Sequence, residues 1–288
     1  MKIYILPVHP KLQPKSQKFK YPKHNADFGV EQDFYEYIKK QKDIIVETPN
    51  DADWHYLPVY WTRWHLNHDY GKSGLNELQY EVDKSIIQDI KTFTICQYGD
   101  GPVANLGKAT LFVSSRKNNN GIDIPLLSSP HKKPFFNPSK KYIVSFIGRV
   151  STHPIRQEMI ESLKKQNDIY ICDGNKGSKF FVKKMLESYI SLCPRGYGGS
   201  SFRFFESMQL GVVPFLIGDI DTRPFKKFID WNEISFFSNS TSCLTQMINS
   251  LNKEDLLKMG KKAQIFYKEQ LTYQKWCHYV IKELEVLK

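Results

Sequence analysis

The stretch from Ile190 to Gly218 constrains the fold more than any other part of the sequence. An apolar run at 190–194 is followed by a glycine-rich turn at 195–201, a helical pattern that Gly211 ends, and a second apolar run at 212–217. The order strand, turn, helix, strand is typical of a parallel α/β sheet, in which ligands bind where a loop leaves the carboxyl end of a strand. We therefore predict an α/β fold with a ligand-binding loop at 195–201.

The turn and the start of the helix carry groups that suit an anionic ligand. The backbone N–H groups of Gly196 to Ser201 and the positive end of the helix dipole would face a bound anion. Arg203 and Glu206 are three residues apart, so both side chains lie on one helix face. An arginine suits a diphosphate, and a carboxylate suits the hydroxyls of a ribose. No Gly-Lys-Ser/Thr follows the turn, which excludes a Walker-type loop, and its late position fits a dinucleotide-binding fold poorly.

The same stretch carries a family resemblance. It reads Cys193-Pro-Arg-Gly-Tyr-Gly-Gly-Ser-Ser-Phe-Arg-Phe-Phe-Glu206, which resembles the signature of the exostosin family of glycosyltransferases. Leu210-Gly-Val-Val-Pro214 is similar to the continuation of that signature, and Phe146-Ile-Gly148 with Arg156 is similar to the opening of the same domain. The resemblance is strong from residue 142 to 237 and weaker before it. It implies a GT-B fold, in which two Rossmann-like α/β domains face each other across a cleft.

The resemblance also implies an activity, that of an inverting, metal-independent glycosyltransferase. Such a hexosyl- or pentosyltransferase moves a sugar from a UDP-sugar to an oligosaccharide or glycoconjugate acceptor, with UDP-xylose, UDP-glucuronate and UDP-galactose as candidate donors. Arg203 is expected to act catalytically, because its planar fork neutralises the departing diphosphate. The residues expected to bind the donor are Arg195, Gly196, Tyr197, Gly198, Gly199, Ser200, Ser201, Arg203, Glu206 and Arg149. No metal and no cofactor are expected, and Asp219-Ile-Asp221 is interpreted as a loop near the donor rather than as a metal site.

An inverting transfer needs a base on the acceptor side that takes the proton of the attacking hydroxyl. The candidates are Asp100, which follows a predicted strand, and His65 and His68, which lie in the aromatic segment Trp61–Tyr70; His9 is a further candidate. The aromatic segment is interpreted either as a sugar-binding platform or as ordinary packing. Turn chemistry favours a second interpretation of Asp100, as a turn residue beside glycine. The sequence alone does not rank these candidates.

The best linker lies in the middle of the chain. Residues 128–141 hold three prolines and show no apolar period. We therefore predict an N-terminal, acceptor-side Rossmann-like domain at 1–130 and a nucleotide-sugar-binding domain at 131–288. In folds of the resembled kind the last helix, here at about 270–288, crosses back to the first domain.

Composition limits the compartment and the partners. The net charge is +11, but the lysines are spread along the chain and form no basic arm, so no nucleic-acid partner is expected. No apolar run approaches the roughly 20 residues that span a membrane. The five cysteines are scattered, which indicates free thiols in a reducing compartment. We expect a cytoplasmic enzyme of glycan biosynthesis, of a stand-alone bacterial or virus-encoded type. The alternative is a non-catalytic carbohydrate- or nucleic-acid-binding protein on the same scaffold.

Overall fold

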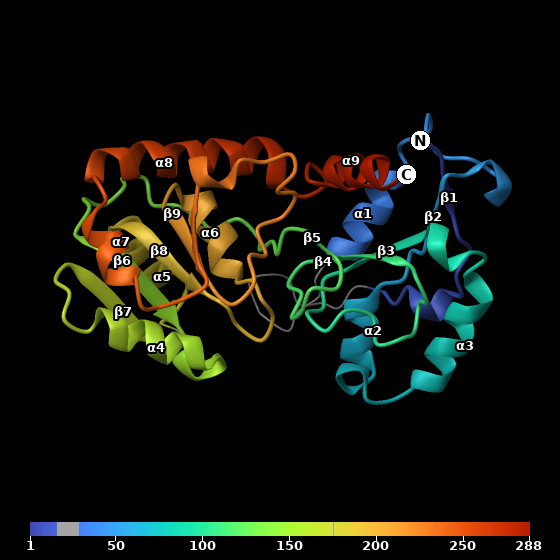
Figure 1. The fold of residues 1–288 in the computed structure, drawn as a ribbon, viewed down its shortest axis with the longest axis horizontal. Coiled ribbons are helices and arrows are strands. Elements are labelled where there is room, and N and C mark those ends of the chain that lie inside the picture. The colour runs from blue at the N-terminus through green and yellow to red at the C-terminus, as the bar shows by residue number, and fades with distance from the viewer. Residues whose placement is uncertain (16–28, 175) are drawn as a thin grey trace. The chain divides into compact units, whose positions relative to one another are not determined.

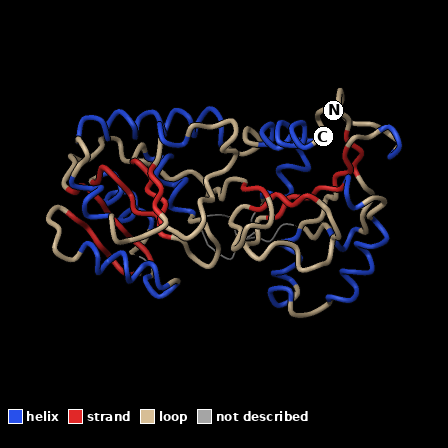
Figure 2. The backbone as a smooth tube through the Cα atoms, in the orientation of Figure 1, coloured by secondary structure: helices blue, strands red, loops and turns tan. Residues whose placement is uncertain are grey.

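The computed structural model describes residues 1–15, 29–174 and 176–288, and the chain divides into two compact units (Figure 1). Unit 1 comprises Met1–Ile124 and Tyr273–Lys288, and unit 2 comprises Pro125–Thr272. Each unit is built on one five-stranded sheet in which every strand pair is parallel (red in Figure 2). The expected pair of Rossmann-like α/β domains of the GT-B fold is confirmed.

The boundary between the units differs from the predicted one. The prediction placed residues up to 130 in the first domain, but the structure assigns Pro125 onward to unit 2. The reason is a contact inside unit 2: Nε2 of Gln209 donates to the backbone oxygen of Ser128 at 3.2 Å. The first part of the proline-containing segment is therefore packed against unit 2 rather than free.

Unit 1 contains strands in the order β1-β2-β3-β4-β5. The strands are β1 (Ile3–Ile5), β2 (Trp54–Tyr56), β3 (Thr92–Cys96), β4 (Thr110–Val113) and β5 (Ile122–Asp123). The α-helices are α1 (Val30–Ile38), α2 (Trp61–Asn67), α3 (Leu75–Ser85) and α9 (Cys277–Leu287). Short 3₁₀ helices span Pro10–Leu12, Pro49–Asp51, Asp69–Gly71 and Asp89–Lys91.

The core of unit 1 joins the start of the chain to its end. The Phe34 ring of α1 lies 6.0 Å from the Phe93 ring of β3 and 6.1 Å from the Trp276 ring, which directly precedes α9. Nε1 of Trp54 donates to the backbone oxygen of Leu284 in α9 at 3.1 Å. The last helix is therefore part of the unit 1 core, although more than 150 residues separate it from the other elements of that unit.

Unit 2 contains strands in the order β10-β9-β8-β6-β7. The strands are β6 (Tyr142–Gly148), β7 (Ile169–Asp173), β8 (Ser188–Pro194), β9 (Val213–Ile217) and β10 (Phe236–Ser238). The α-helices are α4 (Pro154–Leu163), α5 (Ser178–Leu186), α6 (Phe202–Leu210), α7 (Leu244–Asn249) and α8 (Lys253–Phe266). Val150–Thr152 and Trp231–Glu233 are 3₁₀ helices, and Tyr267–Leu271 is a π-helical turn.

The central strands of unit 2 are buried on both faces. Strand β8 pairs with β6 on one side and β9 on the other, and β9 is buried along its whole length. Such strands read as continuous apolar runs, which is why the sequence identifies them readily. The carboxyl ends of β6, β8 and β9 lie at the same edge of this parallel sheet, so the loops after Gly148, Pro194 and Ile217 start there.

No helix among the described residues combines the length and the apolar character that crossing a membrane requires.

Candidate active site

Residues 195–201 form the loop between β8 and α6 at the carboxyl edge of the unit 2 sheet. Two hydrogen bonds hold this loop: Arg195 N donates to Ile217 O at 2.8 Å, and Thr222 Oγ1 donates to Gly199 O at 3.1 Å. Ser201 is the N-cap residue of α6, but its side chain makes no capping hydrogen bond. The side chain of Ser201 therefore does not satisfy the backbone N–H groups at the start of α6.

Arg203, in the first turn of α6, has an almost enclosed guanidinium. Nη2 donates to the backbone oxygen of Ile147, and the guanidinium carbon lies 4.7 Å from the centre of the Phe146 ring. Nε and Nη1 are buried and have no hydrogen-bond partner among the described residues. Burial lowers the pKa of Arg203. Because unpaired buried donors are costly, this guanidinium is suited to receive an anion.

Gly148, the last residue of β6, makes room for that guanidinium. A Cβ atom at position 148 would collide with Nη2 of Arg203. The glycine that belongs to the Phe146-Ile-Gly148 resemblance thus has a steric function at the candidate site.

Arg156 of α4 is a second buried arginine close to Arg203. Its guanidinium carbon lies 5.8 Å from the centre of the Phe146 ring, which Arg203 also contacts. It donates to three backbone oxygens at the edge of the sheet, those of Arg149 (2.6 Å), Arg195 (2.9 Å) and Pro194 (3.3 Å). Burial and then the charge of Arg203 lower the pKa of Arg156 to about 10. Arg156 therefore fixes the end of β8 and adds positive charge near Arg203, a role that the sequence analysis did not assign.

The two carboxylates of the Asp219-Ile-Asp221 sequence are paired with arginines. Asp219 pairs with Nη1 of Arg195, whose Nε is buried without a partner among the described residues. Asp221 accepts three bonds from Arg223, at 2.9 Å from Nε, 3.0 Å from Nη2 and 3.1 Å from the backbone N–H. Burial raises the pKa of Asp221, but the bonds and charge of Arg223 leave it below its usual value. Both carboxylates thus neutralise arginines next to the loop, and no metal-binding cluster of His, Cys, Asp or Glu occurs in the described part of the chain.

Glu206, one turn after Arg203 in α6, is paired with a histidine. Its Oε1 lies 2.9 Å from Nε2 of His131, and both side chains are almost buried. The charge of Glu206 acts on Arg203, opposing the effect of burial on the pKa of that arginine. The sequence analysis missed His131 because it assigned the whole of 128–141 to a linker.

The remaining residues predicted to bind the donor lie around the same loop. Tyr197 is 74% exposed, whereas Gly198, Gly199, Ser200 and Ser201 are buried. The side chain of Arg149 is exposed at the end of β6, and its backbone oxygen accepts from Arg156. The structure thus brings all the predicted donor residues to one edge of one sheet.

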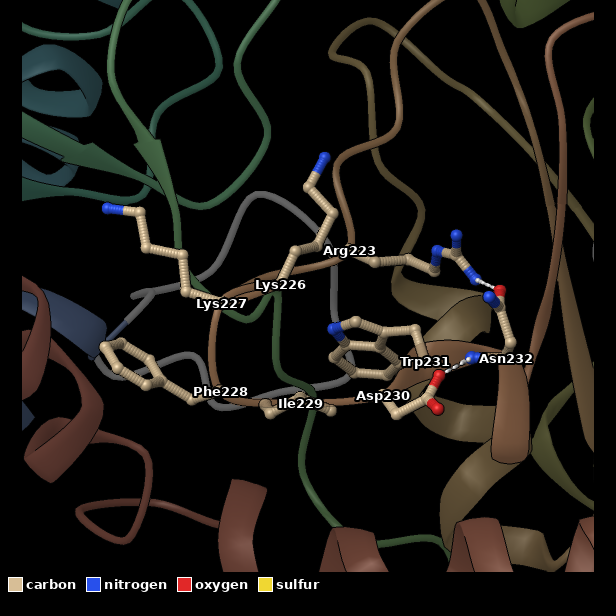
Figure 3. Close-up of a pocket in the computed structure, with 8 residues that line it drawn as sticks. All are labelled: Arg223, Lys226, Lys227, Phe228, Ile229, Asp230, Trp231 and Asn232. Carbon is tan, nitrogen blue, oxygen red and sulfur yellow. Dashed lines mark hydrogen bonds between the residues drawn. The ribbon is translucent and has the colours of Figure 1, made fainter.

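A hollow of about 440 Å³ is formed by residues 223–232, which follow strand β9 (Figure 3). It is lined by Arg223, Lys226, Lys227, Phe228, Ile229, Asp230, Trp231 and Asn232. Lys226 Nζ donates to Asp221 O at 2.7 Å, and Figure 3 shows Arg223 turned toward Asn232. None of the lining residues is one that the sequence predicts for the donor. The hollow begins one residue after Thr222, which holds the donor loop, and its lining combines three cationic side chains with the carboxylate of Asp230.

Three of the predicted base candidates come together in unit 1. The His65 ring, in α2, lies 4.5 Å from the Tyr98 ring, and the charge of Asp100 acts on both of these residues. His65 has no exposed surface, and neither ring nitrogen has a partner among the described residues. Burial lowers the pKa of His65 to about 4, against the opposing charge of Asp100. Because an enclosed ring cannot contact an acceptor, the expectation that His65 is the base is not supported.

The other two candidates keep some surface. Asp100 has a side chain that is 44% exposed and pairs with Lys117. His68 stacks on Trp64 with ring centres 4.0 Å apart, and its Nδ1 donates to the backbone oxygen of Trp64 at 2.8 Å. That bond leaves Nε2 of His68 as the nitrogen able to accept a proton. His9 caps a short helix by accepting from the backbone N–H of Lys11 at 3.2 Å.

Glu31 is a buried carboxylate that the sequence analysis did not single out. Its Oε1 accepts three hydrogen bonds, from Thr62 N (3.2 Å), Thr62 Oγ1 (2.7 Å) and Gln97 N (2.9 Å). Burial raises the pKa of Glu31 to about 7, although these bonds favour the charged form. Glu31 therefore links the start of α1 to the start of α2 and the end of β3. A usable signal was present, because Glu31 shares the buried stripe of α1 with Phe34 and Ile38.

Comparison with known proteins assigns the family. The profile of the Exostosin GT47 domain matches residues 74–253, which is more than half of the chain. The chain belongs to the exostosin GT47 family of glycosyltransferases. The family resemblance on the 193–206 stretch is thereby confirmed, and the matched region contains both the candidate donor loop and Asp100.

The similar curated proteins are exostosins. Exostosin-1 of Drosophila melanogaster is 24% identical over 206 residues, which cover 58% of this chain and 27% of the relative. Exostosin-1b of Danio rerio is 24% identical over 199 residues, which cover 57% and 27%. The match to this exostosin GT47 chain thus spans about a quarter of the length of these relatives.

Solved structures give weaker similarities. The crystal structure of TarM aligns with a TM-score of 0.38 and 14% identity, over 71% of this chain and 57% of that one. The pneumococcal O-GlcNAc transferase GtfA in complex with UDP and GlcNAc aligns with a TM-score of 0.31 and 12% identity, over 72% and 44%. At such low TM-scores these structures carry no argument about the substrate of this exostosin GT47 chain.

Proposed function

We propose that this chain is an inverting glycosyltransferase that moves a hexose or pentose from a UDP-sugar to a glycan acceptor without a metal ion. The observation that carries the proposal is the Arg203 guanidinium, which is buried at the carboxyl edge of the sheet with Nε and Nη1 unpaired among the described residues. Arg156 and Arg195 add two more nearly buried positive charges there. A nucleoside diphosphate would supply negative charge to Arg203 and Arg156, whereas Arg195 is already paired with Asp219.

The chemistry follows from where charge develops. As the bond between the anomeric carbon and the diphosphate breaks, negative charge accumulates on the leaving phosphate oxygens. Donors that are already oriented stabilise that charge without reorganisation. Arg203 would bind the phosphate oxygens through its free nitrogens, because the guanidinium matches phosphate geometry in a bidentate manner. Glu206 would accept hydrogen bonds from the ribose hydroxyls.

Inversion requires a direct displacement in which an acceptor hydroxyl attacks the anomeric carbon. Its proton must pass to a base. We assign this role to unit 1, with the Asp100 carboxylate as the first candidate and Nε2 of His68 as the second, because both side chains retain exposed surface. Replacing each in turn, Asp100→Asn and His68→Gln, separates them. The variant that lacks the true base should turn over at least about a hundredfold more slowly, with little change in donor affinity.

The decisive experiment measures UDP binding by calorimetry in the presence of EDTA. We expect binding by the wild-type chain and roughly ten- to hundredfold weaker binding by Arg203→Met, because a hydrogen bond to a charged group contributes about 1.5–3 kcal/mol. The matched control is Arg116→Met, since Arg116 is also paired and mostly buried but belongs to unit 1. Equal loss in both variants, or UDP binding only with added Mn²⁺, contradicts the proposal.

The donor and the stereochemistry need a second experiment. Incubation with UDP-xylose, UDP-glucuronate and UDP-galactose in turn, followed by proton NMR of the first product, reveals which sugar is released or transferred. We expect the anomeric configuration opposite to that of the donor. A product that retains the configuration contradicts inversion. UDP binding without turnover of any donor favours a non-catalytic binding protein instead.

A further inference from the structure

His131 lies outside the predicted site but contacts one of its members, Glu206, directly. Its Nε2 is 2.9 Å from Oε1 of Glu206, and its backbone N–H donates to Oε1 of Gln209 at 3.2 Å. Glu206 and Gln209 are three residues apart on α6, so both contacts lie on one helix face. On its other side the His131 ring lies 5.4 Å from the Phe181 ring of α5, and Nδ1 is 3.5 Å from Ser178 Oγ.

The tautomer follows from these partners. A carboxylate oxygen only accepts hydrogen bonds, so Nε2 of His131 carries a proton, and this N–H donates a hydrogen bond to Oε1 of Glu206. With side-chain exposures of 5% and 8%, this bond is shielded from water. Among the described residues this is the hydrogen bond of the Glu206 carboxylate, and it uses Oε1, so the second oxygen, Oε2, remains available.

Gln209 explains why His131 occupies this position. Its Nε2 donates to Tyr267 Oη at 2.9 Å and to Ser128 O at 3.2 Å, while its Oε1 accepts from His131 N. The amide of Gln209 therefore holds both ends of the 128–131 stretch against α6. The histidine is presented to Glu206 by a fixed piece of backbone rather than by a free linker.

We propose that His131 is a positioning residue for the donor. Its Nε2–H donates a hydrogen bond to Oε1 of Glu206 and so orients the carboxylate, leaving Oε2 to accept hydrogen bonds from the ribose hydroxyls of the nucleotide. This inference rests on the proposed function. It adds that recognition of the ribose depends on a histidine 75 residues before Glu206, whereas recognition of the diphosphate depends on Arg203. The two recognition steps are thus separable by experiment.

The test compares UDP with 2′,3′-dideoxy-UDP, which keeps the diphosphate and lacks the ribose hydroxyls. For the wild-type chain we expect UDP to bind more tightly than the dideoxy analogue. For His131→Phe, which keeps the ring contact with Phe181 but cannot donate, UDP affinity should fall about five- to twentyfold while that of the analogue stays unchanged. His131→Gln, which retains an N–H donor, should restore most of the difference. His278→Phe in unit 1 is the control and should match the wild type.

The outcomes distinguish this inference from the function on which it depends. If the wild-type chain binds neither nucleotide, the proposed function fails. If Arg203→Met weakens both nucleotides but His131→Phe weakens neither, or weakens both equally, only the positioning role is wrong. Thermal unfolding of each variant shows whether it is folded, and His131→Gln keeps the test open should the phenylalanine variant unfold. A Glu206→Gln, His131→Phe double variant should lose no more ribose discrimination than either single variant.

Discussion

Glu31 and His65 are buried titratable residues of unit 1 whose pKa values shift in opposite directions. Burial raises the pKa of Glu31 from 4.5 to about 7 and lowers that of His65 from 6.5 to about 4. Between pH 4.5 and 7 the folded Glu31 holds a proton that the unfolded chain releases, so its contribution to stability falls as pH rises. Between pH 4 and 6.5 the unfolded His65 binds a proton that the folded ring excludes, so its contribution rises with pH. From about pH 4.5 to 6.5 the two effects oppose each other.

We therefore predict that Glu31→Gln unmasks the effect of His65. The variant keeps an oxygen acceptor for Thr62 and Gln97 but no longer titrates. Its free energy of unfolding should fall more steeply than that of the wild type on acidification from pH 6.5 to 5, by an additional 1.4 kcal/mol or so per pH unit. Urea unfolding followed by tryptophan fluorescence reports mainly on unit 1, because only Trp231 lies in unit 2.

His65→Phe supplies the converse control for this prediction. Without the histidine, the Glu31 effect remains alone, so stability should decrease as pH rises over the same range. Parallel pH profiles for the wild type and both variants would show that neither group titrates as its burial requires.

At this scale the sequence predicts a residue's neighbours along the helix but not its partners across the fold. Arg203 and Glu206 were expected at the donor loop from their spacing, and both lie there. His131 was not, because its contact with Glu206 depends on a backbone path that no local pattern encodes. His65 was expected in an aromatic segment with exposed function open to it, but its burial depends on packing against Tyr98, which lies in a distant loop.

Among the elements, helix α8 shows how closely the layers of unit 2 pack. A Cβ atom at Gly260, in the middle of α8, would lie 2.5 Å from the backbone oxygen of Gly211 and 3.2 Å from its carbonyl carbon. Gly211 ends α6 in the left-handed conformation, with φ of 75°. Because Gly260 has no side chain, the backbone at Gly211, between α6 and β9, can approach helix α8 closely.

Gly260→Ala should accordingly destabilise the protein although it improves helix propensity. Alanine gains about 1 kcal/mol over glycine in a helix, but its methyl group would meet main-chain atoms that cannot rotate away. We expect a net loss of about 1–3 kcal/mol. The control is Lys261→Ala, the next and exposed position, which should change stability by less than about 0.5 kcal/mol. Thermal unfolding followed by circular dichroism measures both, and a stabilised Gly260→Ala variant would contradict the packing argument.

The elements themselves were largely predictable where the strands are buried on both faces. The alternation of strand and helix from 142 to 217 is seen as expected, because continuous apolar runs and helix-ending residues mark each element. The terminal helix was predicted at about 270–288, but α9 begins at Cys277, after a turn at 272–276. Neither glycine nor proline marks that break, so local sequence did not reveal it.

On the scale of the whole molecule, each unit has a core of its own, but the chain does not traverse them in simple succession. Residues 273–288 return to unit 1, where Trp276, Val280 and Leu284 have no exposed surface. The candidate donor residues, by contrast, all lie in unit 2. Changes in the last helix should therefore lower the stability of unit 1 while leaving the nucleotide affinity of unit 2 nearly unchanged.

Leu284→Ala tests this separation. Removing a fully buried leucine typically costs 2–5 kcal/mol, so unit 1 should unfold at a lower urea concentration. Calorimetry with UDP should still give an affinity within about twofold of the wild type. Leu287→Ala, on the same helix but 44% exposed, should change neither quantity appreciably. A large loss of UDP affinity in Leu284→Ala alone would show that the units are not energetically independent.

The return of α9 to unit 1 also sets an order of events during synthesis. Residues 125–272 emerge from the ribosome before α9 does. Unit 2 can therefore form its complete core while unit 1 still lacks Trp276 and Leu284. The nascent unit 1 keeps the apolar surface around Phe34 and Phe93 uncovered until the last helix emerges. The half of the protein that is made first is thus the half that is finished last, and it is the half for which chaperone protection matters during translation.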